Sequence, residues 1–376
     1  MTNPCVQLDV LGQSIWLDDI RRSMITSGQL RKMIEQDGLR GMTSNPSIFE
    51  KAIVGSHDYD KAIQLLVKTG KNATEIYEAL TEQDVRDAAD CFRVVYDKSE
   101  GRDGYVSLEV NPHLAHDTEG TIAEAQRLWK RVNRPNIFIK VPGTIEGLPA
   151  ITQLIREGIN VNVTLLFGLK RYRAVTEAFM EGLQARLADG HTLDKLSSVA
   201  SFFLSRIDVL LDPLFDGMIA HGRERGETAK KLKGQVAIAS AKIAYQIYKD
   251  IFSPELFGSL AEQGARPQRV LWASTGTKNP AYSDIKYVES LIGPGTINTV
   301  PLETLNAYKD HGKPKLTLEE DVDNAEWVYG QLPRLGIDME KVAHQLEDEG
   351  VQKFITPFDQ LMATINTAIE RRGGTP

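Results

Sequence analysis

Residues 136–144 read N-I-F-I-K-V-P-G-T, an apolar run interrupted by a single lysine. In an extended strand successive side chains point to opposite faces, so the aliphatic residues share one face and Lys140 lies on the other. Burial disfavours a charged ammonium, and a neutral amine can attack a carbonyl to form a Schiff base. Because Pro142 ends the strand, Lys140 is expected near a strand's C-terminal end, where α/β enzymes place their chemistry. The alternative is a lysine that reaches solvent from a strand edge.

Strand-like apolar runs recur along the chain, with helical stretches between them. We count eight such runs, at 15–19, 41–45, 105–110, 136–141, 159–167, 197–203, 269–274 and 296–301. Eight β/α units predict an α/β fold, a closed (β/α)8 TIM barrel. No linker or repeat breaks the chain, so residues 1–376 are expected to form one barrel domain.

Helical periodicity fills the intervals between these runs. Ser27 is the expected N-cap of a first helix that ends at Gly38 and buries Leu30, Met33 and Ile34 at i, i+3, i+4 spacing. Further helices are predicted at 47–69, 73–97, 118–133, 146–157, 168–188, 205–221 and 227–252. Residues 317–372 are predicted to form a C-terminal helical extension packed on the barrel, where it can cover one mouth.

Composition narrows the classes of function. The chain has 44 basic and 51 acidic residues, a net charge of −7, and no long block of one sign, which argues against a nucleic-acid or anionic-membrane surface. Cys5 and Cys91 lack metal-ligand spacing, as do the seven histidines, so no metal is expected. No secretion signal and no apolar run of about 18 residues is evident, so no membrane contact and a cytoplasmic location are expected. The oligomeric state stays open between a monomer and a homodimer.

Polar side chains occur on the inner faces of several predicted strands. A buried parallel strand is usually apolar on both faces, so such residues need an explanation. The residues expected to converge in a polar catalytic core are Asp18, Asn45, Glu109, Lys140, Asn162 and Thr164. The alternative for Asp18 and for the neighbouring Thr43 is a purely structural pairing with other polar residues.

A second group of polar residues follows the sixth and seventh predicted strands. The segment S-F-F-L-S-R supplies Ser201 and Arg206, and A-S-T-G-T-K supplies Ser274 and Lys278. Barrel enzymes often hold phosphate groups at this position. The alternative is that the two cations are solvated surface charges.

Two longer stretches resemble the signatures of the transaldolase family. These are G-M-T-S-N-P-S-I-F at 41–49 and I-F-I-K-V-P-G-T-I-E-G-L-P-A at 137–150. Shorter segments that also match the family extend the resemblance over most of residues 10–300. The chain length is similar to that of the family's longer bacterial subgroup.

The resemblance implies a role for each candidate residue. Lys140 is implied as the Schiff-base lysine, Glu109 and Thr164 as holders of a catalytic water, and Asp18 as the acid/base on a sugar hydroxyl. The residues implied to contact the substrate are Asn45 and Asn162 for a dihydroxyacetone moiety, Ser201, Arg206 and Ser274 for the phosphate and the sugar, and Phe203 as a pocket wall. Gly276 stands where shorter members carry a second phosphate arginine, so Lys278 is expected in that role.

The implied activity is a step of the pentose phosphate pathway. A dihydroxyacetone unit moves from a ketose phosphate, sedoheptulose 7-phosphate or fructose 6-phosphate, to an aldose phosphate, glyceraldehyde 3-phosphate or erythrose 4-phosphate. No cofactor and no metal are implied. Two alternatives stay open: a Schiff-base aldolase that releases free dihydroxyacetone, and a non-catalytic barrel that binds sugar phosphates.

Overall fold

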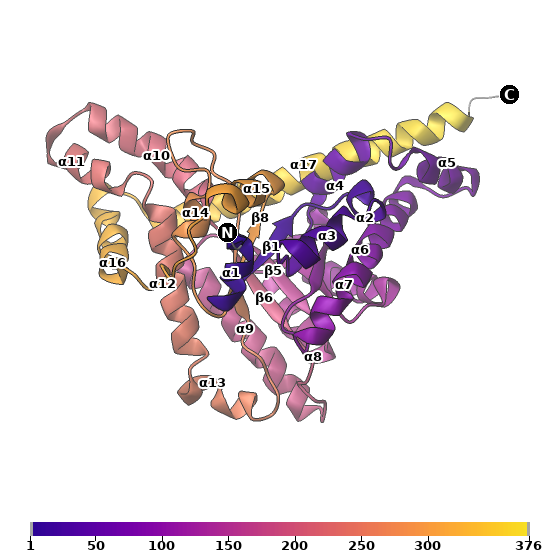
Figure 1. The fold of residues 1–376 in the computed structure, drawn as a ribbon, viewed down its shortest axis with the longest axis horizontal. Coiled ribbons are helices and arrows are strands. Elements are labelled where there is room, and N and C mark those ends of the chain that lie inside the picture. Colours follow the sequence, from indigo (N-terminus) through magenta and orange to yellow (C-terminus); the bar gives the residue numbers. More distant parts are fainter. Residues whose placement is uncertain (1–2, 374–376) are drawn as a thin grey trace.

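The computed structural model describes residues 3–373, and within them parallel strands form a closed barrel in chain order (Figure 1). The strands are β1 (Gln13–Asp18), β2 (Gly41–Thr43), β3 (Tyr105–Glu109), β4 (Ile137–Pro142), β5 (Val161–Leu166), β6 (Ser198–Phe203), β7 (Arg269–Ala273) and β8 (Thr296–Val300). β1 pairs with both β2 and β8, which closes the ring. The predicted (β/α)8 barrel is confirmed.

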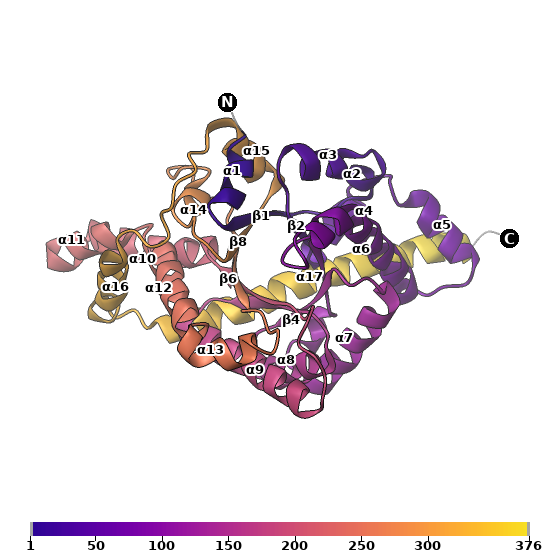
Figure 2. The ribbon, with the colours of Figure 1, turned by 60° about the horizontal axis from the view of Figure 1, so that its bottom comes forward.

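Helices surround the barrel and supply the crossovers between consecutive strands (Figure 2). Those up to β5 are α1 (Pro4–Val10), α2 (Arg22–Thr26), α3 (Gln29–Gln36), α4 (Pro46–Val54), α5 (Asp60–Lys68), α6 (Ala73–Lys98), α7 (Thr118–Val132) and α8 (Gly147–Glu157). Those after β5 are α9 (Leu169–Ala188), α10 (Ser205–Ala220), α11 (Arg223–Leu232), α12 (Val236–Ile251), α13 (Pro254–Ala261), α14 (Lys286–Glu289) and α15 (Leu302–His311).

Several predicted boundaries were wrong. Ser27 is not the N-cap of α3, because the cap is Gly28 at φ +78°, although Leu30, Met33 and Ile34 are buried as expected. The helix predicted at 47–69 is two helices, α4 and α5. The helix predicted at 227–252 is likewise interrupted at Gly234, whose φ of +69° is a left-handed conformation that an α-helix does not contain.

Aromatic rings fill the N-terminal half of the barrel. Phe138 stacks on Tyr105 with ring centroids 4.3 Å apart and on Trp16 at 6.2 Å. Offset stacking adds to the free energy gained by burying this area. The aromatic filling lies at the end of the strands opposite to the predicted site residues.

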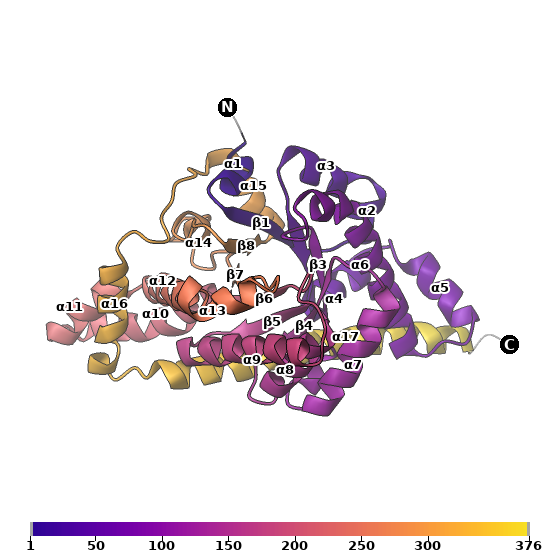
Figure 3. The ribbon, with the colours of Figure 1, turned by 90° about the horizontal axis from the view of Figure 1, so that it is seen from below.

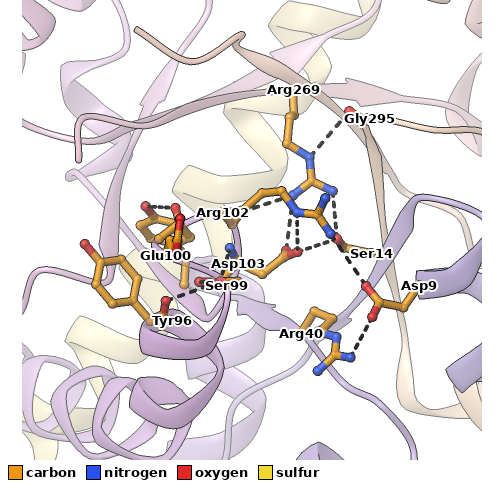
Figure 4. Close-up of polar contacts among 12 residues, drawn as sticks. Asp9, Ser14, Arg40, Tyr96, Ser99, Glu100, Arg102, Asp103, Arg269 and Gly295 are labelled. Atoms are coloured by element: carbon orange, nitrogen blue, oxygen red, sulfur yellow. Dashed lines mark hydrogen bonds and ion pairs between the residues drawn. The ribbon is translucent and has the colours of Figure 1, made fainter. Parts of the chain in front are cut away.

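A buried polar network closes the same N-terminal end (Figure 4). Asp103, only 1% exposed, accepts hydrogen bonds from Ser14 Oγ at 2.7 Å, Trp16 Nε1 at 3.1 Å and Arg269 Nη1 at 3.2 Å. Arg269 also donates to the carbonyl of Gly295 at 3.4 Å. The network therefore joins β1, the turn before β3, β7 and the turn before β8.

The C-terminal region contains α16 (Val322–Gln331), a short 3-10 turn (Pro333–Leu335) and the long helix α17 (Met339–Gly373). Figures 2 and 3 show α17 as a rod that runs from near α16 to near α5. It packs against α4, α6 and β5, and its apolar side chains there are buried, among them Leu346, Phe354 and Leu361. Within residues 3–373 no helix has the length and apolar character needed to cross a membrane.

Candidate active site

A cavity of about 460 Å³ lies at the C-terminal ends of the strands. Nine of the predicted site residues line it, namely Asp18, Asn45, Lys140, Thr164, Ser201, Phe203, Arg206, Ser274 and Lys278. Glu109 and Asn162 are not part of the lining, but each contacts a lining residue, as described below. The barrel thus brings together residues that are separated by more than 250 positions in the sequence.

Lys140 occupies the bottom of this cavity. Its side chain is nearly buried, and Nζ donates a hydrogen bond of 3.0 Å to the carbonyl oxygen of Ser44. Nζ is also 3.3 Å from Oε2 of Glu109, because the strand register places these residues opposite each other on β3 and β4. These two contacts hold the amine at one position in the cavity.

Glu109 and Thr164 carry polar atoms without a hydrogen-bond partner. Both carboxylate oxygens of Glu109 and the hydroxyl of Thr164 are buried, and none of the three forms a hydrogen bond to protein within residues 3–373. Buried polar groups are usually satisfied, often by an ordered water. Burial raises the pKa of Glu109, against the opposing effect of the Lys140 charge. Glu109 can therefore hold a proton at a higher pH than an exposed glutamate.

Asp18 ends β1 on another side of the cavity. Thr43 Oγ1 donates to Asp18 Oδ1 at 2.6 Å and lies 2.7 Å from the hydroxyl of Thr299 on β8. Burial raises the pKa of Asp18, while Lys140 and the Thr43 hydrogen bond act in the opposite direction. A carboxylate with a raised pKa is a stronger base, so Asp18 is suited to remove a proton from a hydroxyl.

Asn162 lies beside this group and links three strands. Its Nδ2 donates to Ser107 Oγ at 3.0 Å, and its Oδ1 accepts from Ser201 Oγ at 2.7 Å. The strand predicted at 159–167 spans Val161–Leu166 in the structure. Within it Leu165 has a φ of +62°, and the pairing register shifts between Val163 and Leu166. The predicted alternation, with Leu165 on the aliphatic face of a regular strand, therefore ends at Thr164.

Asn45 is not part of a strand, contrary to the predicted run 41–45. β2 ends at Thr43, and Asn45 is the N-cap of α4, where its Oδ1 accepts from the backbone N–H of Ile48 at 3.0 Å. Because the oxygen is used by the cap, the Nδ2 group is the one suited to contact a ligand in the cavity.

Arg206 is an unpaired cation at the other side of the cavity. It is the second residue of α10, and its guanidinium lies over the rings of Phe203 at 5.4 Å and Phe354 at 6.0 Å. Nη1 is buried without a hydrogen-bond partner, and no carboxylate within residues 3–373 forms an ion pair with it. A buried cation of this kind, beside the N-terminus of a helix, is a favourable position for an anion.

Ser274 and Lys278 complete this side of the cavity. Ser274 has a left-handed φ of +53°, and its Oγ lies 2.9 Å from Ser205 Oγ at the start of α10. Strained backbone of this kind is concentrated at functional sites. Lys278 is exposed. A Cβ at Gly276 would lie 3.0 Å from Pro301 Cγ, which leaves little room for an arginine at that position.

Several lining residues were not identified from the sequence as site residues. Among them are Lys51 on α4, Thr299 on β8, and Lys353 and Phe354 on α17. The apolar periodicity of 317–372 indicates a helix, but nothing local shows which of its faces lies against the barrel. These assignments needed the tertiary structure.

Comparison with known proteins gives matches over almost the whole chain. Residues 15–365 match the family model described as "Transaldolase/Fructose-6-phosphate aldolase". A protein of Trichodesmium erythraeum named "Transaldolase" is 48% identical over 375 residues, 99% of each chain. "Transaldolase 2" of Nostoc punctiforme is 47% identical over 98% of each chain, and "Transaldolase" of Frankia alni is 46% identical over 99% of each.

Proposed function

Since this chain belongs to the transaldolase/fructose-6-phosphate aldolase family, we propose that it transfers a dihydroxyacetone unit between sugar phosphates through a Schiff base on Lys140. The observation that carries this proposal is the buried amine of Lys140, 3.3 Å from Glu109, in the cavity that also contains the unpaired Arg206. An amine for a carbonyl and a cation for a phosphate match the two ends of a ketose phosphate. The reaction is a transfer step of the pentose phosphate pathway.

Imine formation begins with loss of a proton from Lys140. Glu109 is the carboxylate paired with this amine, and burial raises its pKa, so it can take this proton. The neutral amine attacks the C2 carbonyl of the ketose, and the carbinolamine then loses its hydroxyl as water. A water molecule held between Glu109 and Thr164, whose polar atoms have no protein partner, would return the proton to that leaving hydroxyl.

Cleavage of the C3–C4 bond is assigned to Asp18. Its carboxylate takes the proton of the C4 hydroxyl as this becomes the carbonyl of the departing aldose. The electron pair of the broken bond passes into the protonated imine, which becomes an enamine on Lys140. An acceptor aldose then reacts by the reverse sequence, with Asp18 as the acid. The imine stabilises the electrons of the broken bond, so these steps need only the chain's own side chains.

Substrate binding is assigned to the remaining predicted site residues. Arg206, with the N-terminal N–H groups of α10, would hold the phosphate group, assisted by Ser274 and Lys278. Asn45 and Asn162 would contact the hydroxyls of the dihydroxyacetone unit. Ser201 hydrogen-bonds Asn162 and would fix its orientation, and Phe203 forms a wall beside Arg206.

Reductive trapping tests the Schiff base. Incubation with fructose 6-phosphate and borohydride should add a dihydroxyacetone-derived mass to the peptide that contains Lys140. An adduct on another lysine, or none, would contradict the proposal and favour a barrel that only binds sugar phosphates. Product analysis without an acceptor tests the aldolase alternative, since a transaldolase should release free dihydroxyacetone far more slowly than it transfers it.

Two wider features belong to the same proposal. Phe354 and Lys353 of α17 line the cavity of the barrel, so we infer that the barrel and the C-terminal extension fold as one domain.

Both cysteines of the described chain are free and buried, the usual state of thiols in a reducing compartment, which supports a cytoplasmic location. Whether the working form is a monomer or a homodimer can be measured by sedimentation.

A further inference from the structure

A charged pair of α17 lies at the mouth of the cavity. Lys353 lines the cavity, and its Nζ is 3.1 Å from Oε2 of Glu349 one helical turn earlier. The two side chains are 55% and 39% exposed, so the pair is in contact with solvent. Hydrogen bonds from Gln345 and then Lys353 keep the pKa of Glu349 below its usual value, so Glu349 is ionised at neutral pH.

The same turn of α17 lies directly against Arg206. A Cβ at Gly350 would lie 3.5 Å from Arg206 Nη1, an ordinary contact distance, and 2.9 Å from Leu165 Cδ2, so this turn of the helix packs tightly on both side chains. Phe354, the next residue after Lys353, also lies under the guanidinium of Arg206. The helix therefore brings Lys353 and Glu349 to the side of the cavity that contains the unpaired cation.

The charges around Arg206 interact differently before and after an anion binds. With Lys353 paired to Glu349, Arg206 is a lining cation whose buried Nη1 has no partner. The other unpaired lysines of the lining, Lys51 and Lys278, are exposed to solvent. Glu349 interacts favourably with the positive charge of Arg206 but would repel a phosphate. Exposed ion pairs within a helix contribute little stability, so Lys353 can leave Glu349 at small cost. A phosphate carries close to two negative charges and offers the stronger partner.

We propose that Lys353 is the second cation that recognises the substrate phosphate, and that Glu349 holds it aside until a phosphorylated sugar binds. The pair would make α17 a determinant of specificity for phosphorylated over neutral sugars. It would also supply the positive charge that is absent at Gly276. The proposal rests on the assignment of Arg206 to the phosphate, but not on the chemistry of Lys140.

Equilibrium binding tests the phosphate site separately from the Schiff-base chemistry of Lys140. Glucitol 6-phosphate has no carbonyl, so its binding needs no Schiff base, and glucitol is the matched ligand without phosphate. Isothermal titration calorimetry on the full chain should show that Lys353→Ala weakens glucitol 6-phosphate binding by about 3- to 10-fold. Glu349→Gln should strengthen it by about 2- to 5-fold, because the repulsion is removed and Lys353 is released. Binding of glucitol should not change in either variant.

The matched control is Lys341→Ala, which removes an exposed lysine from the same helix outside the cavity lining. This variant should bind glucitol 6-phosphate like the wild type. Unchanged affinity in Lys353→Ala would overturn the proposal, as would equal weakening of glucitol and its phosphate, which would indicate a structural role. An equal effect of Lys341→Ala would also overturn it, because general electrostatics of α17 would then suffice. If Glu349 acts through Lys353, Glu349→Gln should increase the affinity for glucitol 6-phosphate less in the Lys353→Ala background than in the wild type.

Discussion

Glu109 and Lys140 face each other across β3 and β4, with Oε2 of the carboxylate 3.3 Å from Nζ of the amine. Both side chains are nearly buried, and Glu109 makes no other polar contact to the described protein. Burying the two charges costs free energy that their attraction recovers only in part. The pair is therefore better explained as a proton-transfer unit than as a stabilising salt bridge.

Lys140→Arg should abolish turnover and leave the fold intact. A guanidinium can still pair with Glu109, but it stays protonated and cannot form an imine. Steady-state transfer assays, with circular dichroism as the check on folding, measure both parts. Substantial activity in a folded Lys140→Arg variant would exclude the Schiff-base mechanism.

Glu109→Gln should slow transfer by about 10²- to 10⁴-fold, the usual contribution of a general acid/base. The amide retains the shape of the side chain but cannot exchange a proton with the water or the amine. Borohydride trapping should still label Lys140, although more slowly. A variant with wild-type kcat would show that proton transfer does not pass through Glu109.

Arg206→Ala should raise KM for phosphorylated sugars by roughly 10- to 100-fold, the value expected for loss of a charge-assisted hydrogen bond, and should change kcat much less. Lys278→Ala tests the exposed lysine expected to assist it. An unchanged KM in Lys278→Ala would make that residue a surface charge. A fall in kcat without a change in KM at Arg206 would argue against a phosphate-binding role.

Asp18→Asn should lose activity while its stability relative to the wild type increases with pH. Burial raises the pKa of Asp18, so its contribution to stability is present below the unfolded pKa and is lost as the pH rises through the folded pKa. The asparagine has no proton to lose, so the stability difference should grow between about pH 4 and pH 8. Urea unfolding of both proteins at pH 4 and pH 8 measures this difference in the free energy of unfolding. A difference that becomes smaller as the pH rises would contradict a raised pKa for Asp18.

Asp103→Ala should destabilise the barrel without changing KM. The substitution removes the acceptor of Arg269, Ser14 and Trp16 at the end opposite to the cavity, and breaking a buried pair of this kind costs about 3–5 kcal/mol. The control is Asp9→Asn, which breaks the half-exposed pair with Arg40 and should cost less than about 1 kcal/mol. If the two variants lower the free energy of unfolding equally, the buried Asp103 contributes no more to stability than the half-exposed Asp9.

The barrel and the position of Lys140 were predictable from local sequence, because each strand has its own short pattern of apolar residues. Alternation within β3 and β4 already places Glu109 and Lys140 on one side, and in-register pairing of parallel strands then brings them together. The stretches 41–49 and 137–150 also resembled the transaldolase family, and the family match confirms that resemblance. Alternation failed where the backbone departs from an ideal strand, at Leu165 with its positive φ and at Asn45, which caps a helix.

The sequence by itself determined the eight strands and most of the residues at their C-terminal ends, because the apolar pattern of each strand is a local property. Only the tertiary structure decided which face of α17 covers the cavity, and hence the place of Lys353 and Phe354 beside Arg206. A helical period shows that one face is buried but not against which surface. That choice depends on long-range packing, here on the contact of α17 at Gly350 with Leu165 and Arg206.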